Sequence, residues 1–225
     1  MLKAVLFDFD GVITDSEVLH FRAFNSVLGP HSVELTTREY YKSYLGLSDV
    51  DCFKLLIHQG RLGIAESEIP ALVEKKTVIF ENLAKNEGKL IDGVRDFLAM
   101  LAQNDIAMGI CSGALLPEIE MILEDANLRR HFETIVSAEH VKKGKPDPEG
   151  FLLAMERINA KRPRQIKPDE CIAVEDARWG LQAAKSAGMH TIGVTNSYDA
   201  EQLTAEIIVG NLKELSLPDL QSLCA

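Results

Sequence analysis

Short apolar runs of strand length recur along the chain, and several are rich in valine and isoleucine. They lie at residues 4–9, 107–111, 134–137, 171–174, 191–194 and 207–209. Within these runs apolar residues follow one another instead of alternating with polar residues, which is typical of strands buried on both faces. The pattern therefore predicts a sheet with helices on both sides.

Longer segments with apolar residues at helical spacing separate these strands. They lie at residues 93–103, 116–126, 148–158 and 177–187. Strands that alternate with helices of this length are typical of βαβ units, in which the strands run parallel. We therefore expect an α/β protein whose Rossmann-like core has three layers around a parallel sheet.

Residues 16–89 break this alternation, because no strand pattern occurs there. Helical patterns fill the segment instead, at residues 17–28, 38–44, 49–59 and 68–86. Asp15 or Ser16 is expected to cap the first of these helices. Small, polar and glycine residues gather at both ends of the segment, which favours chain turns there. We predict a core domain formed by residues 1–15 and 90–225, and an inserted all-helical domain formed by residues 16–89.

Acidic residues outnumber basic ones, with 34 Asp and Glu against 24 Lys and Arg, which gives a formal net charge of −10. Such a charge repels nucleic acids and anionic membranes, so we expect neither as a partner. The four cysteines are scattered without CxxC or zinc-ligand spacing. No apolar stretch approaches the ~20 residues of a membrane helix, and the N-terminus does not resemble a signal peptide. These features predict a cytoplasmic protein.

The first apolar run ends in two carboxylates, Asp8 and Asp10, which are followed by Gly11. Side chains alternate along a strand, so the two aspartates are expected on the same side. They stand at the carboxyl end of the strand, which is the edge where α/β sheets bind ligands, and Gly11 allows a ligand to approach the backbone closely. Acidic residues also cap turns after many strands, and the Asp-x-Asp pattern alone is equally compatible with that simpler role.

Three more polar groups follow predicted strands. Ser112 and Gly113 come after the second strand, where a hydroxyl and backbone N–H groups suit a phosphate oxygen. Lys145 lies in the loop KKGKPDP, whose prolines restrict the backbone and favour a fixed cation. Glu175 and Asp176 follow the fourth strand. With the acids of the first strand, they form a set of oxygen ligands that suits Mg²⁺.

In order and spacing, these four motifs resemble those of the haloacid dehalogenase superfamily. The motifs are DFDGV at residues 8–12, Ser112, Lys145 within GKPDP, and Glu175 with Asp176. The resemblance covers essentially the whole chain, including the helical insertion, which corresponds to a cap domain. The stretch KAVLFDFDGVITDSE at residues 3–17 is most similar to the branch of β-phosphoglucomutases and of small phosphosugar and phosphoglycolate phosphatases.

The resemblance implies a role for each acidic residue. Asp8 would attack phosphorus and form an aspartyl-phosphate. Asp10 would protonate the leaving oxygen and then act as a base. Mg²⁺ would be bound by Asp8, by the backbone carbonyl of Asp10, by Asp176 and by Glu175, the last directly or through water.

The same resemblance assigns Lys145 to neutralising the repulsion between carboxylate and phosphate, and Ser112 to binding phosphate oxygens. Backbone N–H groups near Gly11 and Gly113 would bind the substrate as well. The expected partner is therefore a small-molecule phosphate ester, and the protein is expected to be a monomer, as is common in this branch.

Three residues of the cap are expected to bind substrate. His20 and Lys76 fall where the mutases have a hinge histidine and a cap lysine, and Gly46 begins the cap loop Gly-Leu-Ser-Asp. An ordinary position on a helix face explains His20 equally well, and Lys76 stands in a Glu-Lys-Lys run typical of a solvated surface.

Two departures from the mutases favour a phosphatase. Asp49 stands in place of an arginine that grips the distal phosphate of the mutase substrate, and an acid there would repel that group. Residues 113–116 read Gly-Ala-Leu-Leu instead of a polar Ser-Lys-Asn run. We therefore expect a Mg²⁺-dependent phosphatase of a small phosphorylated sugar or organic acid. The alternatives are a β-phosphoglucomutase-type mutase and a relative that binds without catalysis.

Overall fold

The computed structural model describes residues 1–45 and 47–225. The chain forms two compact units, one made of Met1–Asp15 with Leu90–Ala225 and the other of Ser16–Lys89. We call them the core unit and the inserted unit. Among the described residues, no helix is both long and apolar enough to span a membrane.

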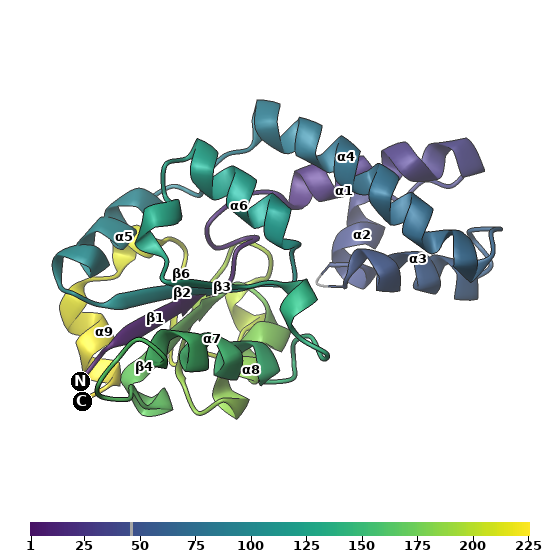
Figure 1. Ribbon diagram of the computed structural model, residues 1–225. Helices are drawn as coiled ribbons and strands as arrows, with labels where there is room; N and C mark the ends of the chain where they lie inside the picture. Colours follow the sequence, from purple (N-terminus) through teal and green to yellow (C-terminus); the bar gives the residue numbers. More distant parts are fainter. Residues whose placement is uncertain (46) are drawn as a thin grey trace. The chain divides into compact units, whose positions relative to one another are not determined.

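The core unit is built on a six-stranded parallel sheet (Figure 1). The strands are β1 (Ala4–Phe7), β2 (Ala107–Cys111), β3 (Thr134–Val136), β4 (Cys171–Glu175), β5 (His190–Val194) and β6 (Ile207–Val209). Their order across the sheet is β3-β2-β1-β4-β5-β6, so the strand order reverses between β1 and β4. In sheets of this kind, ligands bind at the carboxyl ends of the strands beside the reversal.

Helices cover both faces of the sheet, which confirms the predicted α/β class. The core unit contains α5 (Val94–Gln103), α6 (Leu116–Asp125), α7 (Glu149–Asn159), α8 (Arg178–Ser186) and α9 (Leu217–Leu223). Figure 1 shows α5 and α6 on one face and α7 and α8 on the other. Phe7 makes edge-to-face contacts with Phe97 of α5 and with Phe132, whereas Leu6 belongs to an apolar cluster with Phe151 of α7. Both faces of β1 are therefore buried.

Every regular element described in the inserted unit is a helix. It contains α1 (Glu17–Leu28), α2 (Thr37–Ser43), α3 (Asp49–His58) and α4 (Ile69–Glu87). Phe24, Tyr40 and Phe53 belong to its apolar core. Ser16 is the N-cap residue of α1, but its side chain accepts no capping hydrogen bond, since its backbone is already helical (φ −96°, ψ −14°) instead of extended.

Short 3₁₀ helices connect these elements. They are η1 (Gly29–His31), η2 (Glu66–Glu68), η3 (Arg129–His131), η4 (Ala138–His140), η5 (Pro168–Glu170), η6 (Ala200–Gln202) and η7 (Leu212–Glu214). The strand β1 ends at Phe7 instead of Phe9, because the Phe9 carbonyl accepts the N–H groups of Ile13 and Thr14 in a tight turn. The helix α9 was not predicted, since its two turns are too short for a repeating apolar pattern.

Candidate active site

Asp8 is the first residue after β1, and the neighbouring strand β4 fixes its backbone. Its N–H donates to the carbonyl of Val174 at 2.9 Å, which places Asp8 beside Glu175, the last residue of β4. Lys145 approaches both acids: its Nζ lies 2.7 Å from Asp8 Oδ1 and 2.5 Å from Glu175 Oε1. The structure thus brings three of the predicted site residues into direct contact at the carboxyl edge of the sheet.

Burial governs the charges of this trio, because the Glu175 side chain is 0% exposed and that of Asp8 is 13% exposed. Burial raises the pKa of both carboxyls, against the attraction of the Lys145 ammonium. Burial alone would lower the pKa of Lys145, but the two carboxylates outweigh it and hold that pKa well above its usual value. Lys145 is therefore a permanent cation that two buried acids share.

Asp176 joins these acids directly after β4. Among the described residues, the carboxylates of Asp8, Glu175 and Asp176 each offer an oxygen within 4.8 Å of the others. Gly180 of α8 leaves room for this arrangement, since a β-carbon there would lie 2.0 Å from the Glu175 carboxyl. The three carboxylates offer hard oxygen ligands, and together they carry more negative charge than the one ammonium neutralises. Both properties fit Mg²⁺. The Asp10 carboxylate is not in this cluster, and its expected contribution to metal binding is its backbone carbonyl.

Gly11 sits in the tight turn that follows Asp10. Its φ is +76°, and an added β-carbon would lie 1.8 Å from Asp176 Oδ2, so glycine is required here for both backbone and space. Its N–H donates to the Thr14 carbonyl at 2.8 Å. Gly11 therefore lets Asp176 approach, while its own N–H is already used within the turn.

Ser112 follows β2, the other neighbour of β1. Its N–H donates to the Val136 carbonyl at 2.9 Å and its Oγ accepts the Ala114 N–H at 3.0 Å, so this bond does not use the hydroxyl hydrogen. A β-carbon on Gly113 would meet no atom within 4 Å, and the space beside it is open. The predicted phosphate-binding pair thus lies at the same sheet edge as Asp8.

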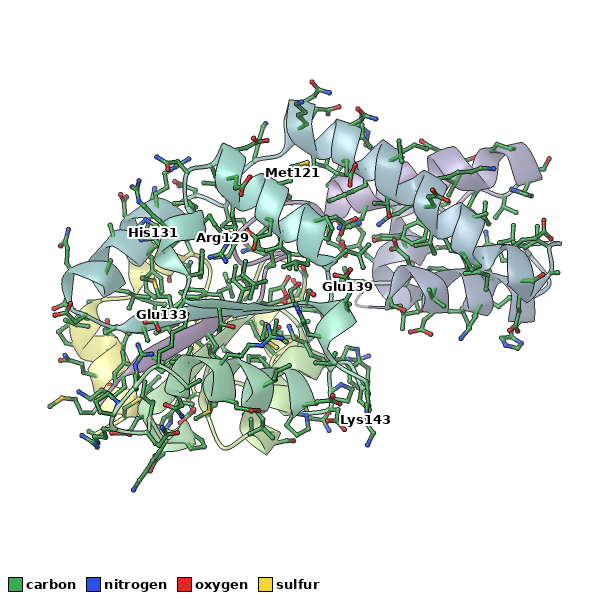
Figure 2. The ribbon with its side chains drawn as sticks, viewed as in Figure 1. Met121, Arg129, His131, Glu133, Glu139 and Lys143 are labelled. Atoms are coloured by element: carbon green, nitrogen blue, oxygen red, sulfur yellow. The ribbon has the colours of Figure 1, made fainter. Side chains whose placement is uncertain are left out.

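Two carboxylates from outside this turn accept the backbone N–H groups with which α6 begins. The carboxylate of Glu139, labelled in Figure 2, accepts the Leu116 N–H at the start of α6 at 2.7 Å. Glu118 Oε2 accepts the Leu115 N–H at 3.3 Å. The start of α6, which would otherwise attract an anion, is therefore occupied by carboxylates.

The inserted unit holds a second buried cation. Lys76 has a side chain that is 0% exposed, and its Nζ lies 3.0 Å from Asp49 Oδ2 and 2.6 Å from His20 Nδ1. The ammonium also lies 5.1 Å from the ring centroids of Phe24 and Phe80. The structure thus brings together the predicted substrate-binding residues His20 and Lys76, whereas Gly46 lies outside the described residues.

These contacts correct two sequence interpretations. Lys76 is not a solvated residue of a Glu-Lys-Lys run but a buried one. Asp49 was interpreted as an acid that repels phosphate, and it instead pairs with Lys76, so each neutralises the other. Both differences have one cause: α3 begins at Asp49 next to the middle of α4, a contact between helices that local sequence does not show.

Sequence reasoning missed two polar residues at the same edge as Asp8. Asn196 Nδ2 donates to the Gly11 carbonyl at 2.7 Å, and Ser197 Oγ donates to Asp176 Oδ2. The available signal was the polar sequence Thr-Asn-Ser directly after the fifth predicted strand.

Comparison with known proteins assigns the chain to a family. A sequence model of the haloacid dehalogenase-like hydrolases matches residues 5–194. The chain belongs to this family. The resemblance identified from the four motifs is thereby confirmed.

Individual members of the family resemble the chain over most of their length. A phosphorylated carbohydrates phosphatase of Thermotoga maritima is 31% identical over 87% of both chains. A β-phosphoglucomutase of Bacillus subtilis is 30% identical over 96% of this chain and 92% of its own. The crystal structure of CbbY from Rhodobacter sphaeroides in complex with phosphate has a TM-score of 0.88 and 25% identity, and the match covers 98% of this chain and 100% of that one.

Proposed function

We propose that this haloacid dehalogenase-like hydrolase is a Mg²⁺-dependent phosphatase. Its substrate would be the phosphate monoester of a small sugar or organic acid. The observation that carries the proposal is the contact of Asp8 with Lys145 beside Glu175 and Asp176. The similarity to the phosphorylated carbohydrates phosphatase of Thermotoga maritima supports the same substrate class.

The proposed reaction gives Asp8 and Asp10 the roles that the family motif implies. The Asp8 carboxylate attacks phosphorus, the bond from phosphorus to the ester oxygen breaks, and Asp10 donates a proton to that oxygen. The product is an alcohol and phosphorylated Asp8. Asp10, now ionised, takes a proton from water as the water attacks phosphorus, and this step releases inorganic phosphate and restores both carboxyl groups.

Lys145 makes this attack feasible, because its charge favours ionised Asp8 and offsets the repulsion from the phosphate. The Ser112 hydroxyl and the Gly113 N–H donate to phosphate oxygens. Asp8, Asp176, Glu175 and the backbone carbonyl of Asp10 would hold Mg²⁺, which supplies Lewis-acid neutralisation of the phosphate charge when bound.

For the two units we propose separate roles. The core unit, residues 1–15 and 90–225, carries the catalytic groups. The inserted unit, residues 16–89, acts as the cap that selects the substrate, with His20, Lys76 and Gly46 as its substrate-binding residues. Closure of a cap over a bound substrate limits bulk water and unwanted acceptors at the reacting phosphate, and the proposed hydrolysis requires one water molecule beside Asp10.

A sugar phosphate mutase is the second candidate, because β-phosphoglucomutase of Bacillus subtilis is among the similar relatives. The two reactions share the first step and differ in whether water or a sugar hydroxyl accepts the phosphoryl group. The charges of this chain favour water. Asp49 neutralises Lys76, and Glu139 occupies the start of α6, so two positions suited to a second phosphate are compensated by acids.

Phosphate release from a panel of small phosphate monoesters, assayed with and without Mg²⁺, tests the proposal. We expect Mg²⁺-dependent release that is fastest with one class of phosphorylated sugar, polyol or organic acid. Absence of release from every ester, including p-nitrophenyl phosphate, would contradict the proposal. Formation of glucose 6-phosphate from β-glucose 1-phosphate without free phosphate would then favour the mutase, and no reaction at all would favour a relative that binds without catalysis.

A further inference from the structure

The carboxylate of Asp176 is held by a side chain from the loop that follows β5. Ser197 Oγ donates a hydrogen bond to Asp176 Oδ2. An aspartate carboxylate rotates about its χ2 bond unless one oxygen is fixed. The Ser197 hydroxyl fixes one oxygen and thereby determines where the other oxygen points.

The neighbouring residue holds the turn that faces Asp176. Asn196 Nδ2 donates to the Gly11 carbonyl at 2.7 Å. An added β-carbon on Gly11 would lie 1.8 Å from Asp176 Oδ2 and 3.0 Å from Ser197 Oγ, so these three residues form one tightly packed group. Two consecutive side chains thus fix both the turn after Asp10 and the carboxylate that packs on it.

The sheet gives this pair a rigid base. Asn196 and Ser197 follow β5, whose Gly193 lies opposite Glu175 in the register with β4. One residue beyond β5, the Thr195 N–H donates to the Val209 carbonyl of β6 at 3.0 Å, so the chain stays anchored as it leaves the sheet. Because this segment is anchored, it holds Ser197 in a fixed position, and Ser197 in turn orients the Asp176 carboxylate.

We propose that Asn196 and Ser197 are positioning residues of the metal site, Ser197 for the carboxylate of Asp176 and Asn196 for the backbone at Gly11. This inference rests on the proposed function, because it assumes the Mg²⁺ site proposed there. Some residues form hydrogen bonds to a metal ligand and thereby orient it. Their removal typically weakens metal affinity by about 10- to 100-fold.

The test is a titration of the full chain with Mg²⁺ alone, by calorimetry and by the shift of the thermal unfolding midpoint. We expect Ser197→Ala to weaken Mg²⁺ binding by about 10- to 100-fold. Ser197→Thr, which retains the hydroxyl, should restore most of the affinity. Ser222→Ala is the matched control, because Ser222 also donates a hydrogen bond, to the Asp219 carbonyl in α9, away from the acids.

Asn196→Ala provides an independent arm, since it leaves the Ser197 hydroxyl in place and should also weaken Mg²⁺ binding. Unfolding midpoints in the presence of chelator separate loss of metal affinity from loss of fold. Wild-type affinity in both alanine variants, or an equal loss in Ser222→Ala, would overturn the proposal. Since no substrate is present, these outcomes are distinct from a failure of the proposed phosphatase activity, which phosphate release by the wild-type protein measures.

Discussion

At the scale of single residues, the chemistry of Asp8 is set by residues distant in sequence. Lys145 lies 137 positions away along the chain and reaches Asp8 Oδ1 at 2.7 Å. Glu175 lies on the adjacent strand and competes for the same ammonium. The motifs predicted which residue types belong to the site, but the sharing of one cation by two buried acids required the structure.

Asp8→Asn keeps the size of the side chain but removes the carboxylate that we propose as the nucleophile. We expect it to lower the rate of phosphate release by at least about a thousandfold. When catalytic groups act as a unit, removal of one of them costs nearly as much rate as removal of all. Asp15→Asn is the control, since Asp15 is exposed in the same stretch. Appreciable turnover by Asp8→Asn, with circular dichroism unchanged, would exclude Asp8 as the nucleophile.

Gly180→Ala tests the packing behind Glu175. Alanine in place of a helical glycine usually stabilises a protein, by up to about 1 kcal/mol. Here a β-carbon would lie 2.0 Å from the Glu175 carboxyl, so we expect lower stability in thermal unfolding and weaker Mg²⁺ binding. Gly29→Ala meets no atom within 4 Å and should be neutral or stabilising. An equal response of the two variants would refute this account of Gly180.

At the scale of secondary structure elements, the pattern of apolar residues predicted the elements whose burial is regular. The continuous apolar runs predicted the strands because both faces of the sheet are covered. The stripe at Leu72, Lys76, Phe80 and Ala84 shows what was missed: four-residue spacing places Lys76 on the buried face of α4. The neighbouring charges suggested a surface, but helical spacing was the better signal.

Asp49→Asn tests the ion pair between α3 and α4. The substitution leaves the Lys76 ammonium buried without its carboxylate, and breaking a buried pair in this way costs about 3 kcal/mol or more. We expect a corresponding loss in the free energy of unfolding measured by urea denaturation. Glu74→Gln, on the exposed side of α4, should leave stability nearly unchanged. A wild-type midpoint for Asp49→Asn would mean that the pair contributes little.

The contact between β5 and the segment before β6 is pH-dependent. Burial tends to raise the pKa of Glu206, but hydrogen bonds from His190 Nδ1 at 2.8 Å and the Thr191 N–H at 2.7 Å lower it below its ordinary 4.5. Folding therefore favours the ionised carboxyl. Its contribution to stability is present above pH 4.5 and is lost as the pH falls through the lowered pKa.

Glu206→Gln should consequently be less stable than wild type at neutral pH, by less than about 1 kcal/mol because solvent screens this partly exposed group. The difference should shrink as the pH falls through the lowered pKa of Glu206 and the wild-type carboxyl is protonated. Thermal unfolding at pH 7 and at a series of pH values below 4.5 measures the difference. A constant difference across this range would show that ionisation of Glu206 is not the cause.

At the scale of the whole molecule, the sheet order β3-β2-β1-β4 makes neighbours of strands whose motifs lie far apart in the sequence. The carboxyl ends of β1, β2 and β4 bring Asp8, Ser112 and Asp176 to one edge. The contacts of Asn196 and Ser197 were not predicted, because they depend on β5 lying beside β4. Asparagine and serine are common in loops of every kind, so their identity alone indicates no role. Only the sheet order places them beside Gly11 and Asp176.

The central claim is that phosphate is transferred to Asp8 before it is released. The most direct test is to incubate Asp10→Asn with Mg²⁺ and acetyl phosphate, whose good leaving group does not need an acid, and to examine the acid-quenched protein by peptide mass spectrometry. Without the Asp10 base, hydrolysis is slowed, so we predict a phosphoryl adduct on Asp8 that is absent from Asp8→Asn. Phosphate release without an adduct, or an adduct on another residue, would contradict the account.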